Sequence, residues 1–86
     1  MTIGAGMPRY TSHKTVYALK IKSVARQLDG DAFITPAEDG YAPFMADVDY
    51  VAKHCPEAGG YYVVYADGYA SFSPAAAFES GYTRDA

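Results

Sequence analysis

The residues with the most reactive side chains are the neighbours His54 and Cys55, together with a second histidine, His13. A nucleophile–base pair needs its two side chains to face each other. Adjacent residues on a helix point about 100° apart, so His54 and Cys55 do not form such a dyad. A structural zinc site needs four ligands, usually with gaps of two or more residues between neighbours, and these residues do not supply one. We therefore expect no catalytic residue and no metal site.

Acidic and glycine pairs elsewhere have simpler explanations than catalysis. Asp47 and Asp49 lack the glycine and the terminal glutamate that a calcium loop requires. Gly59 and Gly60 lead into a predicted strand rather than a helix, so they do not form a phosphate-binding loop. The sequence therefore predicts that the protein is not an enzyme and has no cofactor.

Charge is distributed unevenly along the chain, although its net charge is only −3. Residues 1–27 contain basic but no acidic side chains, and residues 28–86 contain all ten acids. Lys14, Lys20 and Lys22 are therefore candidate contacts for a nucleotide or a nucleic acid, with nearby tyrosines to stack a base. The acids would repel a nucleic-acid backbone, so nucleic acid is not the favoured partner. The alternative is that the basic and acidic parts attract each other within the fold.

A tyrosine-rich segment near the C-terminus predicts a β-hairpin. Asp67-Gly68 is typical of a two-residue type I′ turn, which would join strands over 61–66 and 69–73. Because side chains alternate along a strand, one face is then the predicted core face, with Tyr61, Val63, Tyr65, Ala70 and Phe72. The other face is a predicted protein-binding patch, with Tyr62, Val64 and Tyr69. The alternative is that a helix of the chain itself covers this patch.

The other strands follow from alternation and turn signals. Residues 14–26 contain no Gly or Pro, and their alternating apolar residues favour a strand over a helix. Asp29-Gly30-Asp31 predicts a turn, and short strands are expected at Ala32–Thr35 and Phe44–Ala46.

Two short helices are also expected. Asp47 is the predicted N-cap of a helix at Val48–His54, which Pro56 ends. Val48 and Val51 are its expected inward residues. Ser73-Pro74 predicts the start of a second helix, with Phe78 facing the sheet and Gly81 just beyond its end.

The predicted fold class is therefore α+β, a small antiparallel sheet with a C-terminal β-hairpin and two short helices. A single domain is expected over residues 10–83, between a flexible N-terminal arm (1–9) and a tail (84–86). At 86 residues, there is room for one core. No apolar run approaches the ~20 residues that a membrane helix needs. Because Cys55 is the only cysteine, no internal disulfide is possible, which favours a reducing compartment.

The segment from Pro56 to Tyr82 also carries a family resemblance. Its Gly-Gly-Tyr-Tyr-Val-Val-Tyr strand, Asp-Gly-Tyr turn and final Phe-Glu-x-Gly-Tyr resemble short proteins encoded by tailed bacteriophages and prophages. That resemblance extends over residues 10–83, including the Tyr-Thr-Ser-His-Lys start at Tyr10–Lys14. Residues 56–82 are also similar to the PGDYG family. The resemblance implies a phage origin and a bacterial host cytoplasm, and it implies no particular chemistry.

The hypothesis that combines these observations is a small phage-derived accessory protein. It would act by binding a host or phage protein, alone or as a homodimer, for example as an inhibitor of a bacterial defence or host enzyme. Two alternatives belong to other classes. One is a small-molecule or nucleotide-binding protein, and the other is a minor structural protein of the virion.

Overall fold

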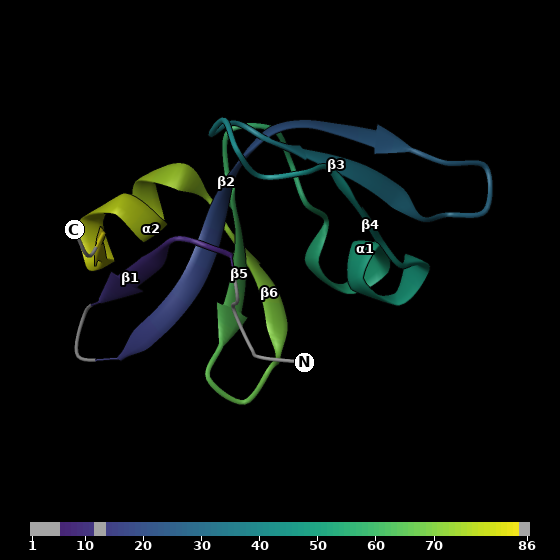
Figure 1. Ribbon diagram of the computed structural model, residues 1–86. Coiled ribbons are helices and arrows are strands. Elements are labelled where there is room, and N and C mark those ends of the chain that lie inside the picture. Colours follow the sequence, from purple (N-terminus) through teal and green to yellow (C-terminus); the bar gives the residue numbers. More distant parts are fainter. Residues whose placement is uncertain (1–5, 12–13, 85–86) are drawn as a thin grey trace.

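A computed structural model describes residues 6–11 and 14–84. It is mostly antiparallel sheet with two short helices, so the predicted α+β class is confirmed (Figure 1). The strands in chain order are β1 (Arg9–Thr11), β2 (Thr15–Arg26), β3 (Ala32–Pro36), β4 (Phe44–Ala46), β5 (Tyr61–Tyr65), β6 (Ala70–Ser73) and β7 (Thr83–Arg84). The helices are α1 (Val48–His54), between β4 and β5, and α2 (Ala75–Gly81), between β6 and β7.

The long strand β2 organises the sheet. Its first half pairs with β1 and with β5, and its second half pairs with β3, which in turn pairs with β4. An irregularity between Ile21 and Ser23 separates the two halves. The order β4-β3-β2-β5-β6 resembles an OB-fold left open between β4 and β6, since no ladder joins those two strands within the described residues. We call the second half of β2 with β3 and β4 the arm, which Figure 1 shows extending away from α2.

The apolar residues form two core clusters. The first lies under α2 and consists of Val16, Ala18, Tyr61, Val63 and Phe78. The second lies between the arm and α1 and consists of Ile21, Ala32, Ile34, Ala46 and Val51, with Tyr62 and Phe72 packed against it. Successive residues of β5 thus serve different clusters, because side chains alternate along a strand. Both faces of the β5–β6 hairpin are covered by the chain itself.

Helix α1 has the bounds that the sequence predicts. The Asp47 carboxylate accepts a hydrogen bond from the Tyr50 N–H at 2.9 Å, which caps the first turn. Cys55 follows the last turn in the left-handed conformation, with φ of 48°. Val51 is buried as expected, but Val48 is 45% exposed, so its predicted inward position is wrong. Its side chain lies at the arm's turn, beside Gly30, rather than in the second cluster.

The β5–β6 hairpin differs from its prediction by one residue in register. Tyr62 lies opposite Phe72, and Val64 lies opposite Ala70. The loop is three residues long, closed by a hydrogen bond from the Gly68 N–H to the Tyr65 carbonyl at 2.9 Å. Gly68 has φ of 90°, whereas Asp67 does not have positive φ, so the type I′ turn is wrong. A one-residue shift exchanges the faces of a strand, which places Phe72 with the second cluster.

The ends of the described chain are more ordered than the sequence suggests. Arg9 lies in β1, although the sequence predicts a flexible segment over residues 1–9. Arg84 lies in β7, although the sequence predicts a tail over residues 84–86. These two strands pair with each other. Helix α2 begins one residue later than expected, with Pro74 as its N-cap and no side-chain cap, and Gly81 is its last residue.

Candidate functional site

Within the described residues, the predicted reactive side chains His54 and Cys55 have other polar neighbours than each other. His54 lies beside Tyr69, with 3.1 Å between its Nε2 and the tyrosine hydroxyl. Cys55 is exposed, and its thiol lies 3.8 Å from the Ala52 carbonyl. His13 is outside the described residues. Residues 6–11 and 14–84 contain no group of three His, Cys, Asp or Glu side chains able to hold a metal. The absence of enzymatic activity stays a prediction.

The predicted protein-binding residues Tyr62, Val64 and Tyr69 do not form one exposed patch. Val64 is only 8% exposed. Tyr62 packs on the second cluster, with its ring 4.7 Å from Phe44 and 5.4 Å from Tyr50, and burial raises the pKa of its hydroxyl. Tyr69 alone is well exposed, at 44%. The cover over Tyr62 comes from β4 and α1, through Phe44 and Tyr50. The role of Tyr62, Val64 and Tyr69 in binding stays a prediction, which geometry limits to Tyr69.

The basic residues of β2 do not form one strip either. Lys20 lies 3.2 Å from the Glu79 carboxylate and 5.7 Å from the centre of the Tyr61 ring. The Tyr61 hydroxyl donates to the same carboxylate at 2.7 Å. The bond from Tyr61, followed by Lys20, lowers the pKa of Glu79. Lys20, although exposed, therefore joins α2 to the sheet, as the internal-attraction alternative predicts, and Lys14 and Lys22 are the exposed cations of the predicted set outside this contact.

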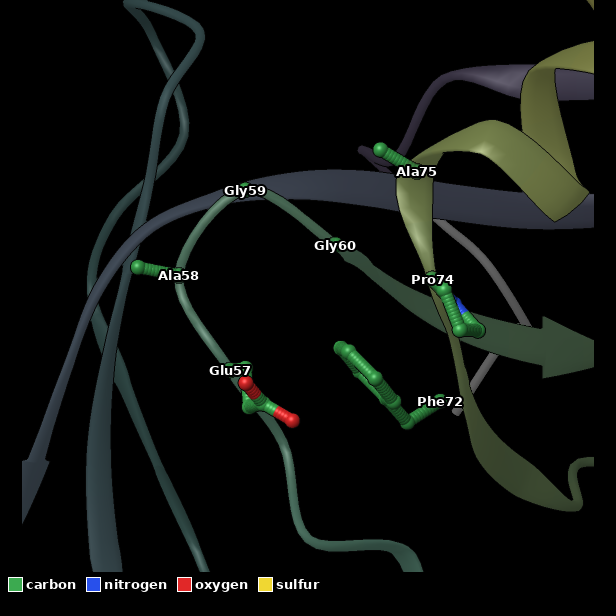
Figure 2. A pocket seen from close by; sticks show the side chains of 7 residues that line it. All are labelled: Glu57, Ala58, Gly59, Gly60, Phe72, Pro74 and Ala75. Atoms are coloured by element: carbon green, nitrogen blue, oxygen red, sulfur yellow. The ribbon is translucent and has the colours of Figure 1, made fainter.

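A hollow lies where the loop before β5 meets the end of β6 (Figure 2). It has a volume of about 250 Å³ and is lined by Glu57, Ala58, Gly59, Gly60, Phe72, Pro74 and Ala75. Figure 2 shows the Phe72 ring beside the backbone of Gly60. A drug-sized ligand usually occupies ~300–1,000 Å³ and meets several convergent polar groups. This smaller hollow offers one ionisable side chain, so it does not by itself favour the small-molecule alternative. A larger hollow of about 510 Å³ is lined by the predicted ligand contact Lys14 with Thr15, Tyr65, Ala66 and Asp67.

The arm carries the clearest exposed apolar surface of the described chain. Ala25, Phe33 and Met45 lie opposite one another on three neighbouring strands, and Ser23 lies opposite Thr35 beside them. We call these residues the outer arm face. Phe33 is 39% exposed and Met45 51% exposed. Sequence reasoning missed this face, although the alternation of Phe33 and Thr35 with Ala32 and Ile34 was a signal for it.

Leu28, in the turn between β2 and β3, is a further exposed apolar residue of the arm, separated from the outer arm face by Gln27 and Asp31. Its side chain is fully exposed. Four of the five large hydrophobic residues exposed in the described chain, all but Tyr69, therefore belong to the arm, its turn or the start of α1. Exposed apolar patches of this kind mark contact surfaces on soluble domains. The molecule thus combines a two-cluster sheet domain with an apolar surface at one end.

Comparisons with known proteins bear on what such a domain does. Models of known families give no match, and curated proteins give none. A similar solved structure is an NMR solution structure of the monomeric form of the phage L decoration protein. The TM-score is 0.70 and the sequence identity is 32%, over 90% of this chain and 58% of that protein. The two share a fold, and the chain spans a little over half the length of the phage L protein.

This comparison favours one of the sequence-based alternatives over the main hypothesis. A phage decoration protein is a structural component of a virion, as in the alternative of a minor virion protein. Nothing in the comparison supports an inhibitor of a host enzyme, a homodimer or a nucleotide-binding protein. No helix within the described residues is long and apolar enough to span a membrane.

Proposed function

We propose that the protein is a phage decoration protein, which binds the outer surface of an assembled capsid. The observation that carries this proposal is the 32% identity to the phage L decoration protein over 90% of the chain, at a TM-score of 0.70. The sequence resemblance to short proteins of tailed phages and prophages supports the same origin. The partner would then be a phage coat protein, and the protein would be made in the bacterial cytoplasm and end on the virion.

The geometry of the domain suits this function better than catalysis. The described residues hold no metal-binding group, and the hollow beside Gly60 is small. Aromatic packing around Phe78 instead holds α2 on the sheet, with 4.3 Å between the ring centres of Phe78 and Tyr61 and 4.8 Å between those of Phe78 and Tyr82. A rigid sheet that exposes an apolar face is suited to docking on a preformed surface, because little ordering is needed on binding.

A sedimentation assay tests this function. The purified protein would be mixed with capsids of the phage whose genome encodes it, prepared without the protein, and centrifuged so that capsids and bound protein pellet together. The matched control is the same coat protein as unassembled subunits, separated by size-exclusion chromatography. We expect saturable binding to capsids. No binding to capsids would contradict the proposal.

The accessory-protein hypothesis predicts a different result. A protein that inhibits a host enzyme would stay in the supernatant with capsids, and it would be absent from purified virions. Mass spectrometry of virions purified through a density gradient separates the two hypotheses, since a decoration protein is present in many copies for each particle.

A further inference from the structure

The outer arm face differs from the rest of the surface in having no ionisable side chain. Its two rows, Ser23 with Thr35 and Ala25 with Phe33 and Met45, are uncharged. The next pair along the ladder, Arg26 with Ala32, points to the opposite side because residues alternate along a strand. Gln27 and Asp31, paired beyond Arg26 and Ala32, return to the side of the face, so Asp31 borders it at one end and Lys22, in the irregularity next to Ser23, borders it at the other. In a chain with 20% charged residues, an uncharged face across three strands is the composition expected at the centre of an interface.

No described element of the chain covers this face. The other side of the arm packs on α1, where Ile34 and Ala46 join Val51 in the second cluster. Helix α2 packs on the first cluster through Phe78. Figure 1 shows α1 on one side of the arm and α2 at the other end of the sheet.

Leu28 is held in place at the tip of the arm by a hydrogen-bonded turn. The Gln27 N–H donates to the Asp31 carbonyl at 2.8 Å, and the Asp31 N–H donates to the Asp29 carboxylate at 2.9 Å. Gly30 has φ of 96°, and a Cβ atom there would lie 2.6 Å from the Val48 side chain. The turn therefore fixes the backbone around an exposed leucine, which lowers the backbone entropy lost when a partner covers it.

The chemistry of the face decides between partners. Nucleic acid needs cations to neutralise phosphates, and the face has none. The face and Leu28 comprise six residues, far fewer than the ~20–30 that each side of a stable interface uses, so they would not by themselves hold two copies of the chain together; on a capsid they would be the apolar centre of a wider contact. A capsid offers a preformed surface that can contact the face and the tip of a projecting arm at once.

We propose that the outer arm face and Leu28 form the surface that docks on the capsid, against an uncharged apolar patch of the assembled coat protein. This inference rests on the proposed function and adds the surface and the chemistry of its partner. It differs from the sequence-based prediction, which placed the contact on the β5–β6 hairpin.

Capsid sedimentation with matched variants tests the assignment. Ala25→Glu adds a carboxylate to the outer arm face, beside Phe33, and Ala76→Glu adds the same group to an exposed alanine of α2. A second variant, Phe33→Thr with Met45→Thr, removes the apolar side chains and keeps β-branched residues that suit a strand. Circular-dichroism melts of each variant establish that it is folded before binding is measured.

We expect Ala25→Glu and the double Thr variant each to weaken capsid binding by about tenfold or more, because buried apolar anchors dominate interface energies. Ala76→Glu should bind like the wild type. If both arm variants bind capsids as tightly as the wild type does, this inference is overturned and the proposed function stands. Equal losses in Ala25→Glu and Ala76→Glu would also overturn it, since added charge alone would then explain the effect. A wild-type protein that binds no capsid would overturn the proposed function and this inference together.

Discussion

The two ends of the molecule use their apolar residues in opposite ways. At the α2 end, the rings of Tyr61, Phe78 and Tyr82 stack on one another, and Glu79 joins Tyr61 to Lys20. At the arm end, the buried residues of the second cluster are aliphatic and include no aromatic ring, and Phe33 and Met45 remain exposed. An apolar side chain left in water contributes nothing to folding by burial. The difference indicates that the α2 end maintains the fold, and it is what we expect if the arm is the docking surface that we propose.

The largest expected effect contrasts one phenylalanine from each end. Phe78→Ala should lower the free energy of unfolding by about 3–5 kcal/mol, because Phe78 is 2% exposed and its removal leaves a cavity. Phe33→Ala should cost below about 1 kcal/mol, since its ring is already partly in water. Urea denaturation followed by circular dichroism measures both values. Similar losses in the two variants would mean that the arm is as important to the fold as the α2 end.

A smaller effect is expected where the hairpin meets the loop before β5. Gly60→Ala should destabilise the fold by about 1–3 kcal/mol, because its Cβ would lie 2.3 Å from the Phe72 ring and 2.9 Å from the Ser73 carbonyl. Gly81→Ala is the matched control, since a Cβ atom there has nothing within 4 Å. The control should be neutral or slightly stabilising in thermal melts, because alanine favours a helix. A neutral Gly60→Ala would argue against the observed position of Phe72.

Removing the cap of α1 should have an effect of about 1 kcal/mol. Asp47→Ala leaves the Tyr50 N–H without the carboxylate that accepts its hydrogen bond. Asp47→Asn is the control, because asparagine caps a helix about as well. Chemical denaturation of the three proteins should rank wild type and Asp47→Asn together, above Asp47→Ala. Equal stability of all three would show that packing alone holds α1 against the arm.

The smallest effect concerns the exposed contact at the α2 end, and it depends on pH. The folded-state pKa of Glu79 lies below its ordinary value of 4.5, so its contribution to stability is present above that pH and is lost as the pH falls through the folded-state pKa. Wild type should therefore melt slightly higher than Glu79→Gln at pH 7, and the two midpoints should converge in acid, once the pH is below the folded-state pKa of Glu79. Glu57→Gln, which removes a carboxylate elsewhere, controls for the change in net charge. A difference that persists in acid would assign the effect to something other than ionisation.

Much of the fold could be predicted because its signals are local. Asp47 and Pro56 fix the two ends of α1, and the alternating residues of β2 and β3 identify them as strands. The terminal strands β1 and β7, of three and two residues, are too short to show any period. Their pairing depends on the ends of the described chain meeting in space, which no local pattern reveals.

The candidate site was harder to predict, for two physical reasons. Asp67-Gly68 suits either a two-residue or a three-residue loop, and both faces of the hairpin are apolar, so the pattern could not select the register. The alternation in β3 indicates that Phe33 and Ile34 point to opposite sides. It does not indicate which side a helix covers, because that depends on how α1 packs after the chain turns back.

The continuity of β2 has a consequence for how the protein unfolds. The first half of this twelve-residue strand pairs with β5 at the α2 end, and the second half pairs with β3 in the arm. The two core clusters therefore share one continuous strand. Opening the arm would strain the same strand that supports the α2 end, and the two ends should therefore melt in a single cooperative transition. On a capsid, this linkage would pass stabilisation of the arm to the whole domain. Amide hydrogen exchange in β5, far from the docking surface, would then slow when the protein is bound.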